Sequence, residues 1–255
     1  MTIRLMKKSN FKTLIPFFTA FLSLVLMSPR VRAADNFALV ELYTSEGCSS
    51  CPPADLLLSR IADVARRDGK PVYLLGFHVD YWNHLGWPDR FSRADFTRRQ
   101  RLYAGVHKST TIYTPQMIVN GRESFSGYRQ DLAQQAIEQN LRRPADAGVH
   151  FDVFAGKEGW KVVYQLSGEW AGKTLNAALV ERGLQTKVER GENAGRLLRH
   201  DNVVRTFYSA QVSGDMGEFQ LDVPQDLAAA NAAVILYIQD PDTMVINGAA
   251  QKNGP

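Results

Sequence analysis

The sequence predicts two regions of different fold class, an α/β region followed by an all-β region. In the first half, an apolar run at 37–43 is followed by a helical pattern and then by a second apolar run at 72–79, which is the order of a strand–helix–strand unit. From about residue 147 onwards, short runs of alternating apolar and polar residues are separated by turn signals, a pattern typical of an antiparallel sandwich. We therefore expect an α/β domain at 36–144 and a β-rich, sandwich-like domain at 147–250.

The first 33 residues have the composition of a secretory signal peptide. A basic start is followed by a mostly apolar stretch at 14–27 and by Val31-Arg32-Ala33, a small-residue cleavage site. The alternative is a membrane anchor, but a helix that spans a bilayer needs about 20 apolar residues. We therefore expect cleavage after Ala33, a periplasmic or secreted protein, and no membrane span in the mature chain.

Removal of this peptide changes the charge of the protein. The full chain has 30 Lys and Arg and 26 Asp and Glu; six of the basic residues and none of the acidic ones lie in 1–33, which leaves 24 against 26 and a net charge of −2. A slightly acidic mature chain lacks the basic composition of a nucleic-acid-binding protein. We expect no nucleic-acid partner.

Cys48 and Cys51 are the only two cysteines, and two serines separate them. They lie between the apolar run and a helical pattern in which apolar residues recur at spacings of three and four. We expect Cys48 at or just before the helix N-terminus, where free N–H groups and the helix dipole stabilise a thiolate. Cys51 then lies about one turn further on. Pro52 and Pro53 suit a first helical turn, where no N–H is needed.

Three interpretations of the cysteine pair are open: a redox-active pair, a metal-binding pair and an inert structural disulfide. A bridge across two residues closes a very small loop and removes little chain entropy from the unfolded state. A mature chain of 222 residues also has enough apolar surface to build its own core. The spacing therefore favours a redox-active pair.

The elements that follow continue the α/β pattern to about residue 142. A polar, aromatic loop follows the strand at 72–79, and a helix is expected at 91–103. The strands expected at 111–119 and 122–125 are joined by Asn-Gly, a strong hairpin signal, and a last helix covers about 129–142. The strands at 37–43 and 72–79 are expected to be parallel, because a helix connects them.

This order of elements, with C-x-x-C after the first strand, resembles the core of the thioredoxin-like superfamily. The resemblance implies a cis bond between Thr114 and Pro115, packed against Cys48 and Cys51. It also implies that the backbone beside Pro115 pairs with a bound peptide like an added strand. From its place in the aromatic loop, Trp82 is expected to line the substrate surface, with ordinary packing under the loop as the alternative.

A narrower resemblance rests on four motifs: VELYTSEGCSSCPPAD, FHVDYWNHLGW, YTPQMIVNG and GENAGRLLRHDNVVR. They are similar to an exported bacterial family, domain of unknown function 1223, with a thioredoxin-like fold. The similarity covers nearly the whole mature chain and brings no established substrate.

Two titratable residues near the cysteines have competing interpretations. Glu41 is similar in place to the acid that thioredoxin-like proteins use to take a proton from the second cysteine; alternatively it is a strand acid bonded to an arginine. His78 ends the second strand, where open α/β sheets carry their sites. It could stabilise a thiolate, ligate a metal, or be a hydrogen-bonded histidine that holds the following loop.

The segment 191–202 is the notable stretch of the second half, because two glycines, a carboxylate, an amide and two arginines suit a structured loop. It could bind an anion or dock on a partner, or it could be a long connection packed against the first region.

The sequence thus predicts an exported thiol–disulfide oxidoreductase that acts on protein or peptide thiols with a redox partner protein. Cys48 attacks, Cys51 resolves the mixed disulfide, and the pair itself is the redox centre, so no organic cofactor is expected. Whether the protein oxidises or reduces its substrate depends on a reduction potential that the sequence does not specify. Two alternatives are a Cu(I)-binding protein using Cys48, Cys51 and His78, and a non-catalytic scaffold.

Overall fold

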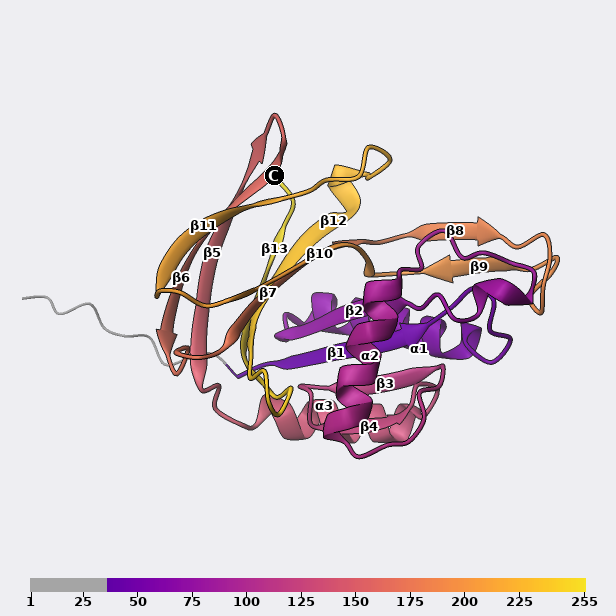
Figure 1. Ribbon diagram of the computed structural model, residues 1–255, viewed down its shortest axis with the longest axis horizontal. Coiled ribbons are helices and arrows are strands. Elements are labelled where there is room, and N and C mark those ends of the chain that lie inside the picture. The colour runs from indigo at the N-terminus through magenta and orange to yellow at the C-terminus, as the bar shows by residue number, and fades with distance from the viewer. Residues whose placement is uncertain (1–35) are drawn as a thin grey trace, which may run out of the picture. The chain divides into compact units, whose positions relative to one another are not determined.

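The computed structural model describes residues 36–255 (Figure 1), which form a mixed α/β fold with few helices. The predicted signal peptide and its cleavage site lie outside the described residues. The first region contains β1 (Ala38–Thr44), α1 (Pro52–Asp68), β2 (Val72–His78), η1 (Asn83–Leu85), α2 (Ala94–Val106), β3 (Gln116–Val119), β4 (Glu123–Ser126) and α3 (Gln130–Leu141). As expected from the connecting helix, β1 and β2 are parallel.

The second region contains strands and one short 3-10 turn. The elements are β5 (Ala147–Gly156), β6 (Gly159–Gly168), β7 (Thr174–Glu181), β8 (Leu184–Lys187), β9 (Leu197–His200), β10 (Val203–Gln211), β11 (Met216–Leu221), η2 (Ala229–Asn231), β12 (Ala232–Gln239) and β13 (Ile246–Asn253). The β8–β9 hairpin and β13 are strands that the sequence pattern did not indicate.

One eight-stranded sheet, in the order β13-β12-β7-β10-β2-β1-β3-β4, joins the regions 36–144 and 147–250 that the sequence analysis treats as separate domains. The junction lies where Val203 of β10 pairs with Gly76 of β2, and the Gly76 N–H donates to the Asn202 carbonyl at 2.8 Å. A Cβ on Gly76 would lie 3.4 Å from that carbonyl oxygen, which is ordinary van der Waals contact. The boundary near residue 145 is therefore not a division between sheets.

The sandwich expected in the second half is present only where a small second sheet packs against part of the eight-stranded sheet. A three-stranded sheet, β11-β6-β5, covers the face of β7 and β12 that carries Leu179 and Leu236. However, β7, β10, β12 and β13 belong to the same sheet as β1–β4. The β-rich half is consequently an extension of the first sheet, not a free-standing sandwich.

Alternation along β1 separates two further cores. Val40 and Leu42 pack with α1 and α3 on one face, whereas Leu39 and Tyr43 pack with Phe96 of α2 on the other face. Successive side chains of a strand point to opposite faces, so each β1 residue is committed to one core. Glu41 has the parity of Leu39 and Tyr43 and therefore faces α2.

Arg99 of α2 is buried in the core on that face. Its guanidinium donates to Glu41 Oε1 at 2.8 Å and to Gln239 Oε1 of β12 at 2.9 Å, and it lies over the rings of Phe77 and Tyr237. Burial is the largest single influence on the pKa of Arg99 and would lower it, but the Glu41 carboxylate and the surrounding tyrosines together raise it. Arg99 thus links α2, β1 and β12 as a permanent positive charge.

We expect Arg99→Ala to lower the free energy of unfolding by about 3–5 kcal/mol, because it leaves the Glu41 charge buried without a partner. Chemical denaturation measures this value. The matched control is Arg101→Ala on the exposed side of the same helix, which should change it by less than about 0.5 kcal/mol. Equal effects of the two substitutions would contradict a central role for the ion pair.

Candidate functional site: a buried disulfide at the start of a helix

Cys48 and Cys51 form a disulfide in the turn between β1 and α1, with their Cα atoms 5.4 Å apart. The turn is closed by N–H bonds from Cys48 to the Ser45 carbonyl and from Cys51 to the Cys48 carbonyl, both 3.2 Å. Cys51 is the N-cap residue of α1, and prolines occupy its first two positions. Cys48 precedes the helix, as the sequence predicted, and Cys51 caps its first turn, where Pro52 and Pro53 have no N–H and the Ala54 N–H donates to the Cys51 carbonyl at 2.9 Å.

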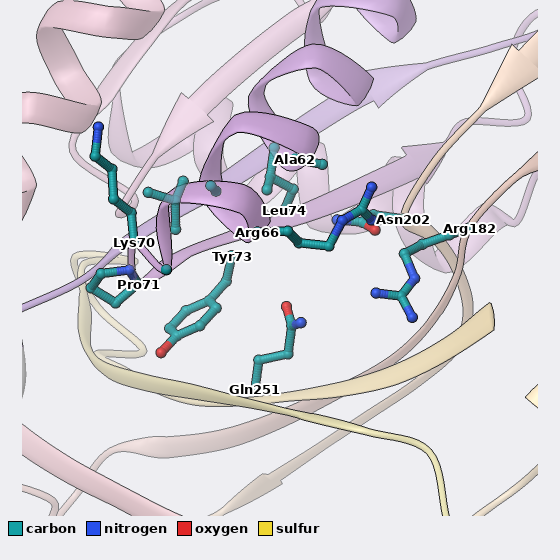
Figure 2. A pocket seen from close by; sticks show the side chains of 12 residues that line it. Ala62, Arg66, Lys70, Pro71, Tyr73, Leu74, Arg182, Asn202 and Gln251 are labelled. Atoms are coloured by element: carbon teal, nitrogen blue, oxygen red, sulfur yellow. The ribbon is translucent and has the colours of Figure 1, made fainter. Parts of the chain in front are cut away.

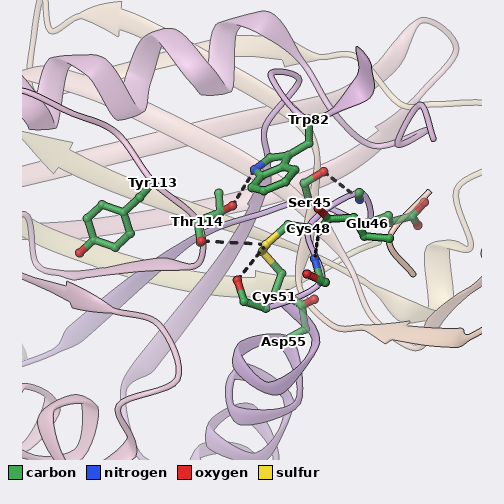
Figure 3. Close-up of a disulfide and its surroundings, with 12 residues drawn as sticks. Ser45, Glu46, Cys48, Cys51, Asp55, Trp82, Tyr113 and Thr114 are labelled. Carbon is green, nitrogen blue, oxygen red and sulfur yellow. Dashed lines mark hydrogen bonds between the residues drawn. A yellow bond between two sulfur atoms is a disulfide. The ribbon is translucent and has the colours of Figure 1, made fainter. Parts of the chain in front are cut away.

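Both cysteines are fully buried, with 0% of their surface exposed. The Cys48 Sγ atom lies 3.4 Å from Ser50 Oγ and 3.9 Å from the Thr114 carbonyl oxygen. The Trp82 indole N–H donates to Thr114 Oγ1 at 2.8 Å, and Figure 3 shows the indole beside the disulfide. Trp82 and Thr114 together therefore cover Cys48.

The Thr114–Pro115 peptide bond is cis, as the resemblance implied. The structure thus brings three of the predicted substrate-binding residues, Thr114, Pro115 and Trp82, to the cysteine pair. Ser49 and Ser50 between the cysteines are exposed, so the open side of the disulfide loop faces solvent there.

The second half of the chain holds the cysteine loop in place. Asn193 is fully buried, and its side-chain amide donates to the carbonyls of Glu46 at 2.9 Å and Cys48 at 3.0 Å. The Ser49 N–H donates to Glu192 Oε2 at 3.0 Å. The segment 191–202 is therefore a connection bonded directly to the cysteine loop.

Glu41 is on the other face of β1 from α1. Its carboxylate accepts hydrogen bonds from Arg99 and Tyr103, which corresponds to the alternative interpretation of an acid bonded to an arginine. Because strand alternation directs Glu41 toward α2, the structure does not place it among the contacts of the cysteines. The predicted role in taking a proton from Cys51 has no geometric support at this position.

His78 is the hydrogen-bonded histidine that holds the following loop. Its Nδ1 lies 2.6 Å from Asp89 Oδ2, which also accepts the Glu46 N–H at 2.8 Å. Burial is the largest single influence on the pKa of His78 and would lower it, but the charge and hydrogen bond of Asp89, together with the Asp55 and Glu46 carboxylates, raise it. Burial opposes ionisation of Asp89, yet the charge and hydrogen bond of His78 lower the pKa of Asp89.

A second set of buried groups continues this cluster toward α1. The Trp87 indole N–H donates to Glu46 Oε2 at 2.8 Å. His200 of β9 lies between two carboxylates, with Nε2 3.4 Å from Glu46 Oε1 and Nδ1 3.7 Å from Asp55 Oδ2. The rings of His78 and His200 are 4.9 Å apart. Sequence reasoning missed Glu46, Asp55 and His200, although Glu46 and Asp55 flank the cysteines in the chain.

A cavity of about 340 Å³ lies at the other end of α1 (Figure 2). Arg66 and Lys70 at the C-terminal end of the helix line it, together with Arg182 and Gln251. A helix of 17 residues is about 25 Å long, so this cavity is remote from the disulfide.

The part of the chain that the structure describes has no group of three or more His, Cys, Asp and Glu side chains arranged to hold a metal ion. Among the same residues, no helix is long and apolar enough to cross a membrane.

Comparison with known proteins identifies the family. A model of a protein family of unknown function, DUF1223, matches residues 39–239. The chain belongs to the DUF1223 family. The crystal structure of protein AGR_C_4864 from Agrobacterium tumefaciens is similar to this DUF1223 protein, with 25% sequence identity and a TM-score of 0.64 over 88% of this chain and 96% of that chain.

A weaker structural match is a domain of the outer membrane lipoprotein Omp28 from Porphyromonas gingivalis. It is 11% identical with a TM-score of 0.24, over 42% of this DUF1223 chain and 86% of that chain. No curated protein matches the chain. These matches do not test the thioredoxin-like assignment, which stays a prediction.

Asn193→Ala should lower the free energy of unfolding by about 1–3 kcal/mol, because the buried Glu46 carbonyl loses its donor. The disulfide should also be reduced faster by a small thiol, since the cysteine loop is less constrained. Glu189→Gln, at an exposed position of the same hairpin, is the control and should change the unfolding free energy by less than about 0.5 kcal/mol. If the disulfide of Asn193→Ala were reduced at the wild-type rate, the β8–β9 hairpin would not restrain the cysteine loop.

The stabilising effect of His78 should depend on pH. Because the pKa of His78 is raised in the folded protein, its contribution to stability is fully present below the ordinary value of about 6.5 and is lost as pH rises through the folded-state pKa. The unfolding free energy of wild type minus that of His78→Gln should therefore fall with rising pH. The same comparison in an Asp89→Asn background should lose this trend, and a difference independent of pH would contradict the pairing.

Proposed function

We propose that this DUF1223 protein is an exported thiol–disulfide oxidoreductase whose redox centre is the Cys48–Cys51 pair. The observation that carries the proposal is the position of the disulfide, at the N-terminus of α1 with the Thr114 carbonyl 3.9 Å from Cys48 Sγ. The positive end of the helix dipole stabilises a cysteine thiolate at this position. A carbonyl and a cis proline beside the same sulfur offer backbone to an extended peptide.

Thiol–disulfide exchange at this site proceeds in two displacements. The Cys48 thiolate attacks one sulfur of a substrate disulfide, and the other substrate sulfur leaves as a thiolate. Cys51 then attacks Cys48, the bond between Cys48 and the substrate breaks, and the Cys48–Cys51 disulfide forms. The substrate disulfide gains two electrons and the cysteine pair loses two. A redox partner protein reduces the pair again, and the same steps in reverse oxidise a substrate.

Cys48 is the better candidate for the first attack. Its sulfur lies against Ser50 and Thr114 next to the exposed serines, whereas Cys51 is the N-cap of α1. Because the sulfurs are buried, a substrate displaces the cover formed by Trp82. Substrates with an extended backbone at Thr114 and Pro115 and a side chain that replaces the indole fit this surface.

The Cu(I)-binding alternative has no observation in its favour. An imidazole can ligate a metal through either ring nitrogen. Nδ1 of His78 is hydrogen-bonded to Asp89, which holds the ring in the buried cluster. The scaffold alternative predicts a cysteine pair without exchange activity, which the following experiment detects.

The test is exchange activity together with trapping of the mixed disulfide. Purified mature wild type should catalyse reduction or oxidation of a disulfide-containing peptide. Cys51→Ala should accumulate covalent adducts through Cys48 in the exported compartment, because the resolving thiol is absent. Cys48→Ala is the matched control and should trap little. Absence of both peptide turnover and Cys51→Ala adducts would refute the proposal and favour the scaffold.

A further inference from the structure

A chain of buried titratable groups leads from the loop after β1 to the first turn of α1. Asp55 is four residues after Cys51 and is 5% exposed. Its N–H donates to the Cys51 carbonyl at 3.1 Å, which closes the first turn of the helix. Residues four apart lie on the same helix face with their Cβ atoms about 5–6 Å apart, and Figure 3 shows Asp55 next to Cys51.

Cys51 needs a base if it resolves a mixed disulfide. The attacking species is the thiolate, and Cys51 is fully buried, so bulk water is not available to take its proton. A proton acceptor has to lie within direct or single-water reach. Glu41 faces α2, whereas Asp55 is a carboxyl on the Cys51 face of α1.

His200 supports Asp55 from the second half of the chain. Its nitrogens face Asp55 and Glu46 at 3.7 and 3.4 Å, and neither nitrogen has a hydrogen-bond partner among the described residues. A neutral imidazole has one N–H donor, whereas the imidazolium has two. His200 therefore lies where one ring nitrogen faces the Asp55 carboxyl and the other faces the Glu46 carboxyl.

We propose that Asp55 accepts the proton of the Cys51 thiol during resolution of the mixed disulfide, and that His200 is the positioning residue that holds the Asp55 carboxyl for this transfer. The proposal rests on the proposed function and assigns the proton step to a residue pair that spans both halves of the chain.

The step balances in protons and electrons. The Cys51 S–H bond breaks and its proton moves to an Asp55 carboxylate oxygen. The Cys51 thiolate then attacks Cys48 Sγ, the Cys48–substrate bond breaks, and the substrate leaves as a thiolate that takes a proton from solvent. The proton on Asp55 returns to solvent through the cluster before the next cycle.

The charged groups around Asp55 come from four parts of the chain. They are His200 of β9, His78 at the end of β2, Asp89 in the following loop, and Glu46 after β1. Burial raises the pKa of Asp55, while His200 and His78 act in the opposite direction. A carboxylate with a raised pKa is a stronger base, which improves proton transfer from a thiol.

The test separates the two thiol steps with dithiobis(nitrobenzoate), an aromatic disulfide that releases a coloured thiolate at each step. Reduced wild type should release one thiolate on attack by Cys48 and a second when Cys51 resolves the adduct. Asp55→Asn should slow the second release by at least about tenfold, the scale of lost general base catalysis, and leave the first unchanged. Asp55→Glu should restore most of the second rate.

The pH profile distinguishes a proton acceptor from a structural residue. In wild type, the rate of the second release should rise with pH through the titration of Asp55. In Asp55→Asn, it should follow the titration of the Cys51 thiol alone. His200→Gln should shift the midpoint of the wild-type profile without changing the first release.

Equal slowing of both releases in Asp55→Asn, or an unchanged pH profile, would overturn the inference and leave the proposed function intact. Two normal releases by wild type and a slowed second release in Asp55→Asn, without turnover of a disulfide peptide by wild type, would refute the proposed function while supporting the proton step at Asp55. No release by reduced wild type would overturn both.

Discussion

The buried positive charge of Arg99 is the constraint on which the centre of this protein depends. An unpaired guanidinium at that depth would be prohibitively unstable, so the surrounding chain supplies Glu41 from β1 and Gln239 from β12. These two partners lie almost two hundred residues apart in the chain, one in each half. The two halves are therefore joined by a compensated charge as well as by the continuous sheet.

The need to compensate buried polar groups also determines how the cysteine loop is held. Buried polar groups need partners, and here the partners of the loop come from the β8–β9 hairpin. Asn193 satisfies the carbonyls of Glu46 and Cys48, and His200 stands between Glu46 and Asp55. The Cys48–Cys51 disulfide on a short turn is thereby held between two regions of the chain. Movement of the hairpin would alter the geometry of the cysteine loop.

The DUF1223 family and the Agrobacterium tumefaciens protein identify relatives of this chain and its fold. The chemistry of the protein depends on the surroundings of the disulfide. The disulfide is sealed by Trp82 and Thr114, so exchange with small thiols is disfavoured unless the cover moves. Under the proposed function, a disulfide sealed in this way suits a protein that reacts with a partner able to displace the indole.

The sequence by itself determined the local features: a cysteine pair between strand and helix, parallel β1 and β2, and the Asn-Gly hairpin. These follow from short-range periodicity and turn chemistry, which do not depend on distant residues. Tertiary structure decided that Glu41 pairs with Arg99 and that His200 and Asn193 reach the cysteine loop. Those contacts join residues 58 to 154 positions apart. Periodicity indicates which face of an element is buried, but not which distant polar group will compensate a buried charge.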